Sequence, residues 1–536
     1  MTTAKKDALR FAISNIAGFG DTDIFPFPTE NHIFHDKPED LLAVLEEIDS
    51  SFDASISSIP VLTSKNLSGV GYSGFRYGTQ IDPLWNAYLL ALVITVGEEI
   101  EKRRVGTSTV FSYRFAPDQV THSLFNKDIG WVNFQLEAIT RAKKFPYVLR
   151  CDISDFYSRI YHHRLENALK VATTNTEAVK RIMKLLTAIS DGPSYGLPVG
   201  GAASRLLSEL LLNRVDRLLQ TNSVNYIRFV DDFIIFSESK ENAHSALITI
   251  SNTLLSNEGL SLQKSKTRIL TSAEFISTSD FGEVHEKESP EEERARTFKR
   301  LRVHYDPYSP TADDDYKKLA EELRKFDIVG MLGRELAKSR IDETLARRLI
   351  SAVKLLPAPL KSDAVRSMLG SMDLLYPVFP SVMLLCAGLL ESLDEKVKET
   401  MFTSIRDLVQ RNSYITQVPA NLAYALRVLV HDASDETEVL IAATYKTSTS
   451  MAIRRDIILI MAHRRADYWI SDKRLSFSTA TGWERRALLI SSYILGDEGE
   501  HWRKSIKHDL NPYEKLVLKW AGDSKSSKGT AWRVPI

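Results

Sequence analysis

The sequence has little cysteine, no excess charge of either sign and no long uninterrupted apolar run. Cys151 and Cys386 are the only cysteines in 536 residues. A disulfide framework or a cysteine-based zinc site is therefore excluded, and the composition is typical of a reducing cytoplasm. Lys and Arg together number 69, as do Asp and Glu. Because the formal net charge is zero, any nucleic-acid binding must be confined to a groove or channel.

Membrane and secretion signals are also missing. The longest uncharged stretch, residues 374–390, is interrupted by Pro377 and Pro380, so a membrane span is not expected. Residues 1–20 mix charges among apolar side chains and lack the apolar segment of a signal peptide. We therefore expect a cytoplasmic protein with no membrane partner.

The length of the chain predicts two or three domains. Residues 1–65 contain several prolines and predict an irregular N-terminal extension with one helix, residues 38–48. Residues 66–280 alternate helical and strand patterns, which predicts an α+β domain. An acidic run followed by a basic run within residues 281–311 predicts a solvated linker, with a binding element as an equal alternative.

The second half of the chain has a different pattern. Residues 312–522 predict successive amphipathic helices separated by Pro, Gly, Asp or Asn. No strict period emerges, so an irregular α-solenoid of HEAT-like hairpins is the expected packing. The Ser- and Lys-rich residues 523–536 predict a flexible tail.

The most informative element is the pentapeptide Phe-Val-Asp-Asp-Phe at residues 229–233. The apolar runs on either side predict two strands joined by a tight hairpin, with Asp231 and Asp232 at the tip, where φ is positive. Two adjacent carboxylates repel each other unless a cation lies between them. The pair is therefore a candidate divalent-metal site, although a plain turn is the commoner explanation for the pair alone.

Asp152 supplies the third carboxylate. It lies near the end of the run 147–153, which predicts a strand leading into a helix; the alternative is that Ser154 or Asp155 simply caps that helix. Three carboxylates can hold two Mg²⁺ ions, with Mn²⁺ as the alternative metal, to activate a 3′ oxygen and stabilise leaving pyrophosphate. Asp152 and the hairpin pair are thus predicted as both catalytic and metal-binding residues.

Three further residues are predicted to bind the nucleotide. Tyr157 would lie near the sugar, where its ring excludes a 2′-hydroxyl group and so favours deoxyribonucleotides. Gly200, in the Gly- and Pro-rich segment 196–204, would let the backbone approach a ligand. Lys266 would hold the triphosphate or protonate pyrophosphate. A plain loop and a solvated basic turn are the alternatives for the last two.

These elements, in this order, resemble the palm of reverse transcriptases. Asp152 with Tyr157 resembles motif A, and residues 196–204 resemble motif B. Residues 229–232 resemble motif C, and residues 259–267 resemble motif D. The resemblance implies a reverse-transcriptase fingers–palm domain over residues 66–280, followed by an all-α HEAT-like helical-repeat domain.

The resemblance extends upstream into the fingers. Residues 75–77 and residues 111–115, Phe-Ser-Tyr-Arg-Phe, resemble fingers segments whose basic residues face triphosphate and template. It therefore implies that Arg76 and Arg114 bind nucleotide.

Within the superfamily the chain is most similar to the abortive-infection (Abi-type) reverse transcriptases of bacterial antiphage defence. Residues 112–115, the helix start at residues 204–210 and the long helical C-terminal half carry this similarity. It implies a bacterial cytoplasmic enzyme that uses deoxynucleoside triphosphates and assembles into homo-oligomers. It also implies DNA synthesis without a template, primed from a protein side chain that stays covalently attached to the product.

Some residues depart from the usual pattern. Phe229 replaces the more usual Tyr before the Asp pair, and Val199 stands where many templated enzymes have Gln, which weakens the case for template copying. No Tyr precedes Tyr72, so a priming hydroxyl would come from a Ser, a Thr or a later Tyr. One candidate region contains Tyr305, Tyr308 and Tyr316.

Two other functions are compatible with the sequence. One is a templated reverse transcriptase that copies a dedicated RNA. The other is an inactive palm that serves as a scaffold, although an idle site has no reason to keep three mutually repelling acids.

Overall fold

The computed structural model divides the chain into two compact units, which are described separately. The described residues are 3–22, 24–26, 28–279, 293–295, 297–298, 323 and 326–536. The first unit comprises Met1–Lys65, Tyr77–Glu283 and Asp497–Trp532. The second comprises Asn66–Arg76, Val284–Gly496 and Arg533–Ile536. Most of the predicted linker 281–311 lies outside the described residues, as do Tyr305, Tyr308 and Tyr316.

The N-terminal segment is far more helical than predicted. It forms α1 (Thr3–Phe19), α2 (Asn31–Asp36), α3 (Pro38–Ser50) and α4 (Phe52–Ser58), so the expectation of a single helix is wrong. The other prolines of the segment, Pro26, Pro28 and Pro60, lie between the helices rather than within them, and Pro38 opens α3, where a missing N–H costs nothing. Buried Leu9, Ile13 and Ile16 lie on one face of α1, which packs against α5 (Pro83–Arg103).

The last helix of the chain packs against these first ones within the same unit. The chain ends in α25 (Gly496–Ile506) and α26 (Pro512–Lys528), and α26 packs against α2 and α3. Trp520 Nε1 donates a hydrogen bond to Asp36 over 2.8 Å, and the Trp520 ring stacks on His32. Because α26 continues to Lys528, the predicted tail 523–536 is in part helical.

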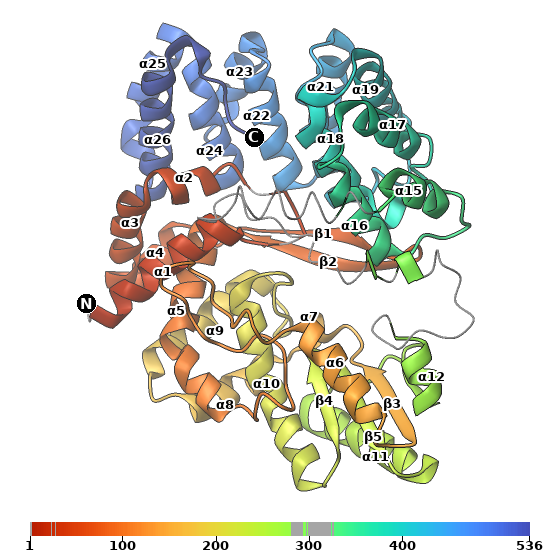
Figure 1. The fold of residues 1–536 in the computed structure, drawn as a ribbon. Helices are drawn as coiled ribbons and strands as arrows, with labels where there is room; N and C mark the ends of the chain where they lie inside the picture. Colours follow the sequence, from red (N-terminus) through yellow and green to blue (C-terminus); the bar gives the residue numbers. More distant parts are fainter. Residues whose placement is uncertain are drawn as a thin grey trace. The chain divides into compact units, whose positions relative to one another are not determined.

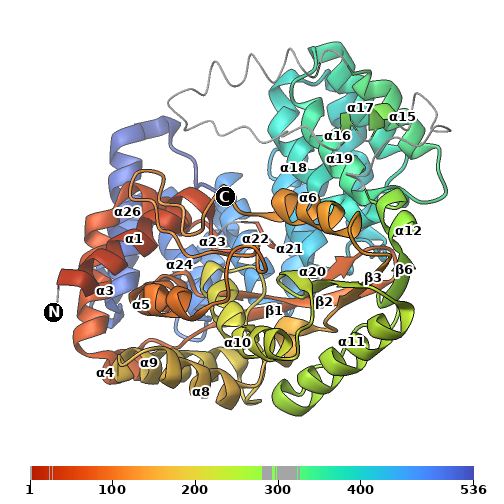
Figure 2. The ribbon, with the colours of Figure 1, turned by 60° about the horizontal axis from the view of Figure 1, so that its bottom comes forward.

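The first unit contains a four-stranded antiparallel sheet, flanked by helices (Figure 1). Its strands, in the order β4-β5-β3-β6, are Tyr226–Phe229, Asp232–Ser237, Tyr147–Asp152 and Arg268–Thr271. The core on one face contains Val148, Ile234 and Phe236, packed with Phe134 and Ala138 of α6 (Trp131–Ala142). Helix α11 (Lys240–Thr253) also packs on the strands, and Figure 2 shows it on the side away from α6.

Further helices complete the first unit. They are α7 (Phe156–Arg159), α8 (His162–Ala172), α9 (Thr176–Ser190), α10 (Ala202–Thr221), the π-helix η1 (Leu254–Glu258) and α12 (Ser272–Ser277). Helix α5 packs against α1, α9 and α10, which explains why it is buried around most of its circumference. The α+β character predicted for this region is confirmed.

The second unit is a two-layered stack of helices. One layer contains α16 (Glu343–Val353), α18 (Phe379–Leu389), α20 (Pro419–Leu429), α22 (Met451–His463) and α24 (Gly482–Ser491). The other contains α15 (Ile328–Leu336), α17 (Ala358–Leu369), α19 (Glu395–Gln410) and α21 (Asp435–Thr447), and α23 (Asp467–Lys473) packs between α22 and α24. Each helix packs against the next member of its own layer. The predicted helical half is confirmed, whereas its HEAT-like character stays a prediction.

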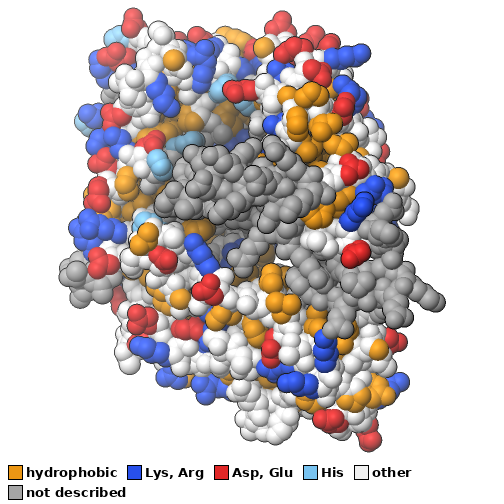
Figure 3. Space-filling model, viewed as in Figure 1, with side chains coloured by type: hydrophobic (Ala, Val, Ile, Leu, Met, Phe, Trp, Pro, Cys, Tyr) orange, Lys and Arg blue, Asp and Glu red, His pale blue; other side chains and the backbone are white. Residues whose placement is uncertain are grey.

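The hairpin of β1 (Thr63–Val70) and β2 (Gly74–Ile81) has its tip in the second unit. There Tyr72 Oη donates to the Leu374 carbonyl over 2.7 Å and accepts from the Ile341 N–H over 3.1 Å. On the face shown in Figure 3, acidic and basic side chains are intermixed, in keeping with the zero net charge. Among the helices that the structure describes, none combines the length and apolarity needed to cross a membrane.

Candidate active site

Strand register brings the three predicted carboxylates to one end of the sheet. Asp152 is the last residue of β3, Asp232 is the first residue of β5, and the two are directly paired. Directly opposed residues in an antiparallel pair have Cβ atoms about 4.5–5.5 Å apart. Asp231 immediately precedes Asp232, and its carbonyl accepts a hydrogen bond from the Ile153 N–H over 3.1 Å. The sequence elements predicted to converge therefore meet.

The hairpin turn is one residue earlier than predicted. Strand β4 ends at Phe229 and β5 begins at Asp232, so the connecting residues are Val230 and Asp231, not the two aspartates. The residue with positive φ is Val230, at 55°, and neither aspartate has it. A β-branched residue in this region is strained, at a cost of about 1–3 kcal/mol. Something must hold Val230 in place.

Both backbone groups of Val230 are held by buried side chains. Its N–H donates to Ser112 Oγ over 2.9 Å, and its carbonyl accepts from Arg228 Nη1 over 2.8 Å. Ser112 Oγ in turn donates to Glu209 Oε1 over 2.5 Å. Ser112, Glu209 and Arg228 are all fully buried. The turn that presents Asp231 is thus held by buried residues from a loop, from α10 and from β4.

These residues belong to a buried ion network under the site. Arg228 contacts Asp216 Oδ2 at 2.6 Å and Glu209 Oε2 at 3.0 Å, and Arg104 contacts Glu209 Oε2 at 2.6 Å. Burial lowers the pKa of Arg228, but Asp216 and Glu209 outweigh it and the pKa is raised. Burial likewise raises the pKa of Glu209, but Arg228 and Arg104 outweigh it and the pKa is lowered. The network pairs two arginines with two carboxylates, so its formal charges cancel.

The sequence reasoning missed this network. Its one visible signal is Arg228 itself, a charged residue in the middle of the apolar strand Tyr-Ile-Arg-Phe-Val. A buried charge requires a buried partner, so Arg228 predicts acidic partners without saying which ones.

Both aspartates of the hairpin have raised pKa values, as expected for crowded carboxylates at a cation site. Burial, together with the charges of Asp152 and Asp232, raises the pKa of Asp231 to about 7. The pKa of Asp232 is raised by burial and by Asp152. Carboxylates held this close resist ionisation until a positive charge joins them.

A lysine ammonium group occupies the position of that positive charge. Lys266 Nζ donates to Asp152 Oδ2 over 2.8 Å. Burial lowers the pKa of Lys266, but the bond to Asp152 and the three nearby aspartates outweigh it and the pKa is raised. In the described part of the chain, no three His, Cys, Asp or Glu side chains already form a complete metal-ligand set. The all-oxygen donors fit a divalent ion such as Mg²⁺, provided that they close around it and Lys266 moves.

Tyr157 and the glycine-rich segment lie beside each other. The Tyr157 carbonyl accepts from the Leu197 N–H over 2.8 Å. The Tyr157 hydroxyl bonds to Ser208, and burial together with Tyr113 raises its pKa. Motif A is thereby joined to motif B through the backbone and to helix α10 through a side chain.

Gly200 contributes to a small cavity of about 140 Å³ that Arg205 also lines. Gly200 has φ 100°, a conformation that side chains disfavour. The Arg205 guanidinium lies 5.1 Å from the centre of the Tyr113 ring. Arg205 also lowers the pKa of the Tyr157 hydroxyl, which places a cation beside the predicted sugar-binding residue. The sequence did not single out this arginine.

The two predicted fingers arginines are placed differently. Arg114 is buried; it donates to the Val105 carbonyl over 2.9 Å and pairs with Glu101 at 2.6 Å. Arg76 is exposed on β2, in the part of the hairpin that belongs to the second unit. Neither arginine is among the contacts that join Asp152, Asp231 and Asp232.

An antiparallel sheet with three converging carboxylates is the arrangement predicted from the sequence for a polymerase palm. The family comparison agrees with this class of protein. Residues 100–305 match the family model for reverse transcriptase (RNA-dependent DNA polymerase). The chain contains a reverse-transcriptase domain and is a nucleotidyltransferase of the RNA-directed DNA polymerase type. No curated protein gives a significant match.

Solved structures that match include telomerases. Apo telomerase from Candida tropicalis has 12% identity and a TM-score of 0.28, covering 72% of this chain and 74% of that chain. Telomerase from Candida albicans with a TWJ fragment of telomeric RNA has 13% identity and a TM-score of 0.29, covering 76% and 71%. Telomerase from Candida tropicalis with a TWJ fragment has 12% identity and a TM-score of 0.28, covering 72% and 68%. The assignment rests on the family match and the site.

Proposed function

We propose that the chain is a metal-dependent DNA polymerase that adds deoxynucleotides to a 3′ end. Its catalytic centre consists of Asp152, Asp231 and Asp232. The observation that carries the proposal is the direct pairing of Asp152 with Asp232, with Asp231 adjacent on a turn that buried side chains hold in a strained conformation. Strain of this kind persists only where the surrounding structure imposes it, and it is concentrated at functional sites.

The residues have distinct roles in the proposed reaction. The three aspartates hold divalent ions, which when bound supply activation of the 3′ oxygen and neutralisation of the leaving pyrophosphate. Lys266 leaves Asp152 and donates a hydrogen bond or proton to the pyrophosphate. Tyr157 limits the space at C2′ of the sugar, and Gly200 lets the backbone approach the nucleotide.

We further propose that synthesis is template-independent, primed from a protein side chain and part of abortive-infection defence in a bacterial cytoplasm, with homo-oligomers as the working form. The similarity to the Abi-type group and the Val199 substitution support this finer proposal. A templated enzyme that copies a dedicated RNA is the second candidate, because the matching family is described as RNA-dependent.

Incorporation of labelled deoxynucleotides by the purified protein with Mg²⁺ or Mn²⁺ tests the activity. We expect incorporation by the parent protein and none by Asp231→Asn. Asp155→Asn is the matched control: Asp155 is exposed and has φ 50°, which Asn tolerates. If no template, primer or metal condition supports incorporation, the proposed activity is refuted.

Two additional measurements separate the finer alternatives. Treatment with RNase abolishes synthesis by an enzyme that copies RNA and leaves template-free synthesis intact. Mass spectrometry of the intact protein detects covalently attached DNA, and digestion then identifies the priming residue. A product free of protein would contradict protein priming without affecting the polymerase assignment.

A further inference from the structure

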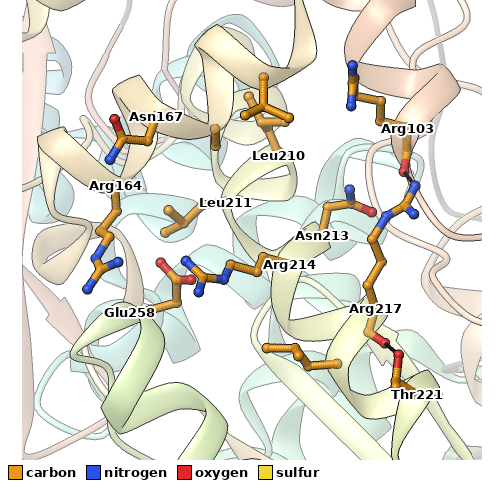
Figure 4. Close-up of a pocket in the computed structure, with 13 residues that line it drawn as sticks. Arg103, Arg164, Asn167, Leu210, Leu211, Asn213, Arg214, Arg217, Thr221 and Glu258 are labelled. Atoms are coloured by element: carbon orange, nitrogen blue, oxygen red, sulfur yellow. Dashed lines mark hydrogen bonds between the residues drawn. The ribbon is translucent and has the colours of Figure 1, made fainter.

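A second cavity lies on the far half of α10 and contains none of the proposed catalytic or nucleotide-binding residues. Its volume is about 480 Å³, within the usual range for small-molecule sites. Side chains from α5, α8, α10 and η1 line it (Figure 4). The α10 residues involved run from Leu210 to Thr221. Glu209 and Asp216, which belong to the ion network under the active site, are not among them.

The cavity is strongly basic. Arg103, Arg164, Arg214 and Arg217 line it, against a single acidic residue, Glu258. Arg103 and Arg217 are tied to the backbone, since Arg103 Nε donates to the Ala172 carbonyl and Arg217 Nη2 to the Arg103 carbonyl. Arg164 and Arg214 are exposed, and Figure 4 shows Arg214 extending toward Glu258. In a protein with zero net charge, four arginines around one cavity favour an anion as its ligand.

The cavity also offers a buried hydrogen-bond acceptor. Asn213 is 8% exposed, and its Oδ1 accepts no hydrogen bond from the described residues. A buried acceptor without a partner costs about 1–3 kcal/mol. A ligand group that carries an N–H or O–H would satisfy it, and a bare inorganic anion would not.

Apolar surface completes the lining. Leu210 and Leu211 are buried in the floor, whereas Val171 is 66% exposed. The lining therefore offers guanidinium groups for phosphate, apolar contacts for a flat ring and an acceptor for an amino or hydroxyl group. A volume of this size suits a single small molecule better than an extended nucleic-acid strand.

We propose that this cavity binds a free nucleoside triphosphate, at a site separate from the polymerase centre. Arg164 and Arg214 contact the phosphates, Val171 and the leucines contact the base, and Asn213 Oδ1 accepts from the base or sugar. Glu258 opposes the phosphates. Burial outweighs the lowering effect of Arg214 and Arg164 and raises the pKa of Glu258 to about 7. Bound nucleotide would brace α10, whose opposite side holds Glu209 and Asp216 in the network below Val230.

Binding of ATP to the full-length protein, measured by calorimetry in EDTA, tests the proposal. EDTA removes divalent metal, so the polymerase centre is not loaded. We expect one saturable site, with adenosine and tripolyphosphate each binding at least about ten-fold more weakly, because each lacks one half of the contacts. Binding of single-stranded DNA without binding of ATP would overturn the proposal.

Matched variants locate the site. Loss of a charge-assisted contact in Arg164→Gln or Arg214→Gln should weaken ATP binding about ten-fold to a hundred-fold. Lys170→Gln is the control, because Lys170 lies on the same helix α8, pairs with Glu166 and does not line the cavity. Unchanged affinity in both arginine variants would refute the site. Because Arg164 has an exposed side chain, its variant remains informative if Arg214→Gln fails to fold.

Glu258→Gln should change the affinity for ATP in the opposite direction to the two arginine variants. Removing the negative charge that faces the phosphates should strengthen ATP binding about two-fold to five-fold. A purely structural role for Glu258 predicts weaker binding. Weaker binding in this variant would therefore count against the proposal, whatever the polymerase activity proves to be.

Discussion

Ser112→Ala tests the idea that the catalytic turn is held in a strained conformation by a buried network. Ser112 is fully buried, and its Oγ links the Val230 N–H to Glu209. The change removes one oxygen and adds nothing. It leaves a buried backbone N–H without a partner, at about 1–3 kcal/mol, and removes one of several bonds to a buried carboxylate. We expect the free energy of unfolding to fall by about 2–4 kcal/mol.

The effect on the reaction should exceed the effect on nucleotide binding. With its N–H released, Val230 can relax from φ 55°, and Asp231 moves with it. A displacement of about 1 Å at a reacting centre can cost about a hundred-fold in rate. We therefore expect kcat to fall about ten-fold to a hundred-fold, with little change in the KM for deoxynucleotide.

Urea unfolding followed by tryptophan fluorescence and steady-state incorporation assays measure the two effects. Ser112→Cys, which keeps a weak donor and acceptor, should give intermediate values. Ser50→Ala is the control, because exposed Ser50 makes only one local bond, from its Oγ to the Glu47 carbonyl. Wild-type kcat in Ser112→Ala would refute the positioning role, and unchanged stability as well would refute the network argument altogether.

Three other predictions concern single residues. The pKa of Glu258 is raised by burial from 4.5 to about 7, so the native state binds a proton more tightly than the unfolded state does. The free energy of unfolding should therefore fall as pH rises from about 4.5 to about 7. Glu258→Gln should flatten that part of a stability–pH profile. Lys266→Gln should lower kcat about ten-fold to a hundred-fold. The unfolding midpoint should not change, because Lys266 is exposed. A loss of stability that accompanies the loss of activity would argue for a structural role. Tyr157→Ala should admit ribonucleotides while Tyr157→Phe should not, as measured by competition between dATP and ATP; exclusion of ATP by both variants would remove Tyr157 from sugar selection.

The sequence predicted the convergence of the carboxylates well, because strand pattern and order along the chain determine it. An apolar run that ends in Asp152 and a hairpin next to Asp232 leave few ways to build an antiparallel sheet. The tip of the hairpin was predicted less well. Local preference assigns positive φ to Asp rather than to Val230, and tertiary contacts from Ser112 and Arg228 override that preference.

Charged residues in the fingers show the limit of pattern reasoning. Arg114 was predicted to face nucleotide, yet it is buried against Glu101, whereas Arg205 beside Tyr113 was not predicted at all. A sequence gives the charge of an arginine but not its partner. Similarly, Trp520 and Asp36 are far apart in sequence but hydrogen-bonded, so the pairing of the first and last helices could not be read from either segment alone.

The buried network also explains how a neutral protein can keep three repelling acids beside a sheet. Arg104 and Arg228 are balanced by Glu209 and Asp216, so the network adds no net charge that would neutralise the aspartates above it. It fixes the backbone instead. The only described ammonium or guanidinium group that bonds the triad is Lys266, which is 63% exposed and therefore able to leave. Fixed carboxylates with a replaceable cation are what an exchangeable metal site requires, because a rigid buried arginine in the same place would compete permanently with the metal.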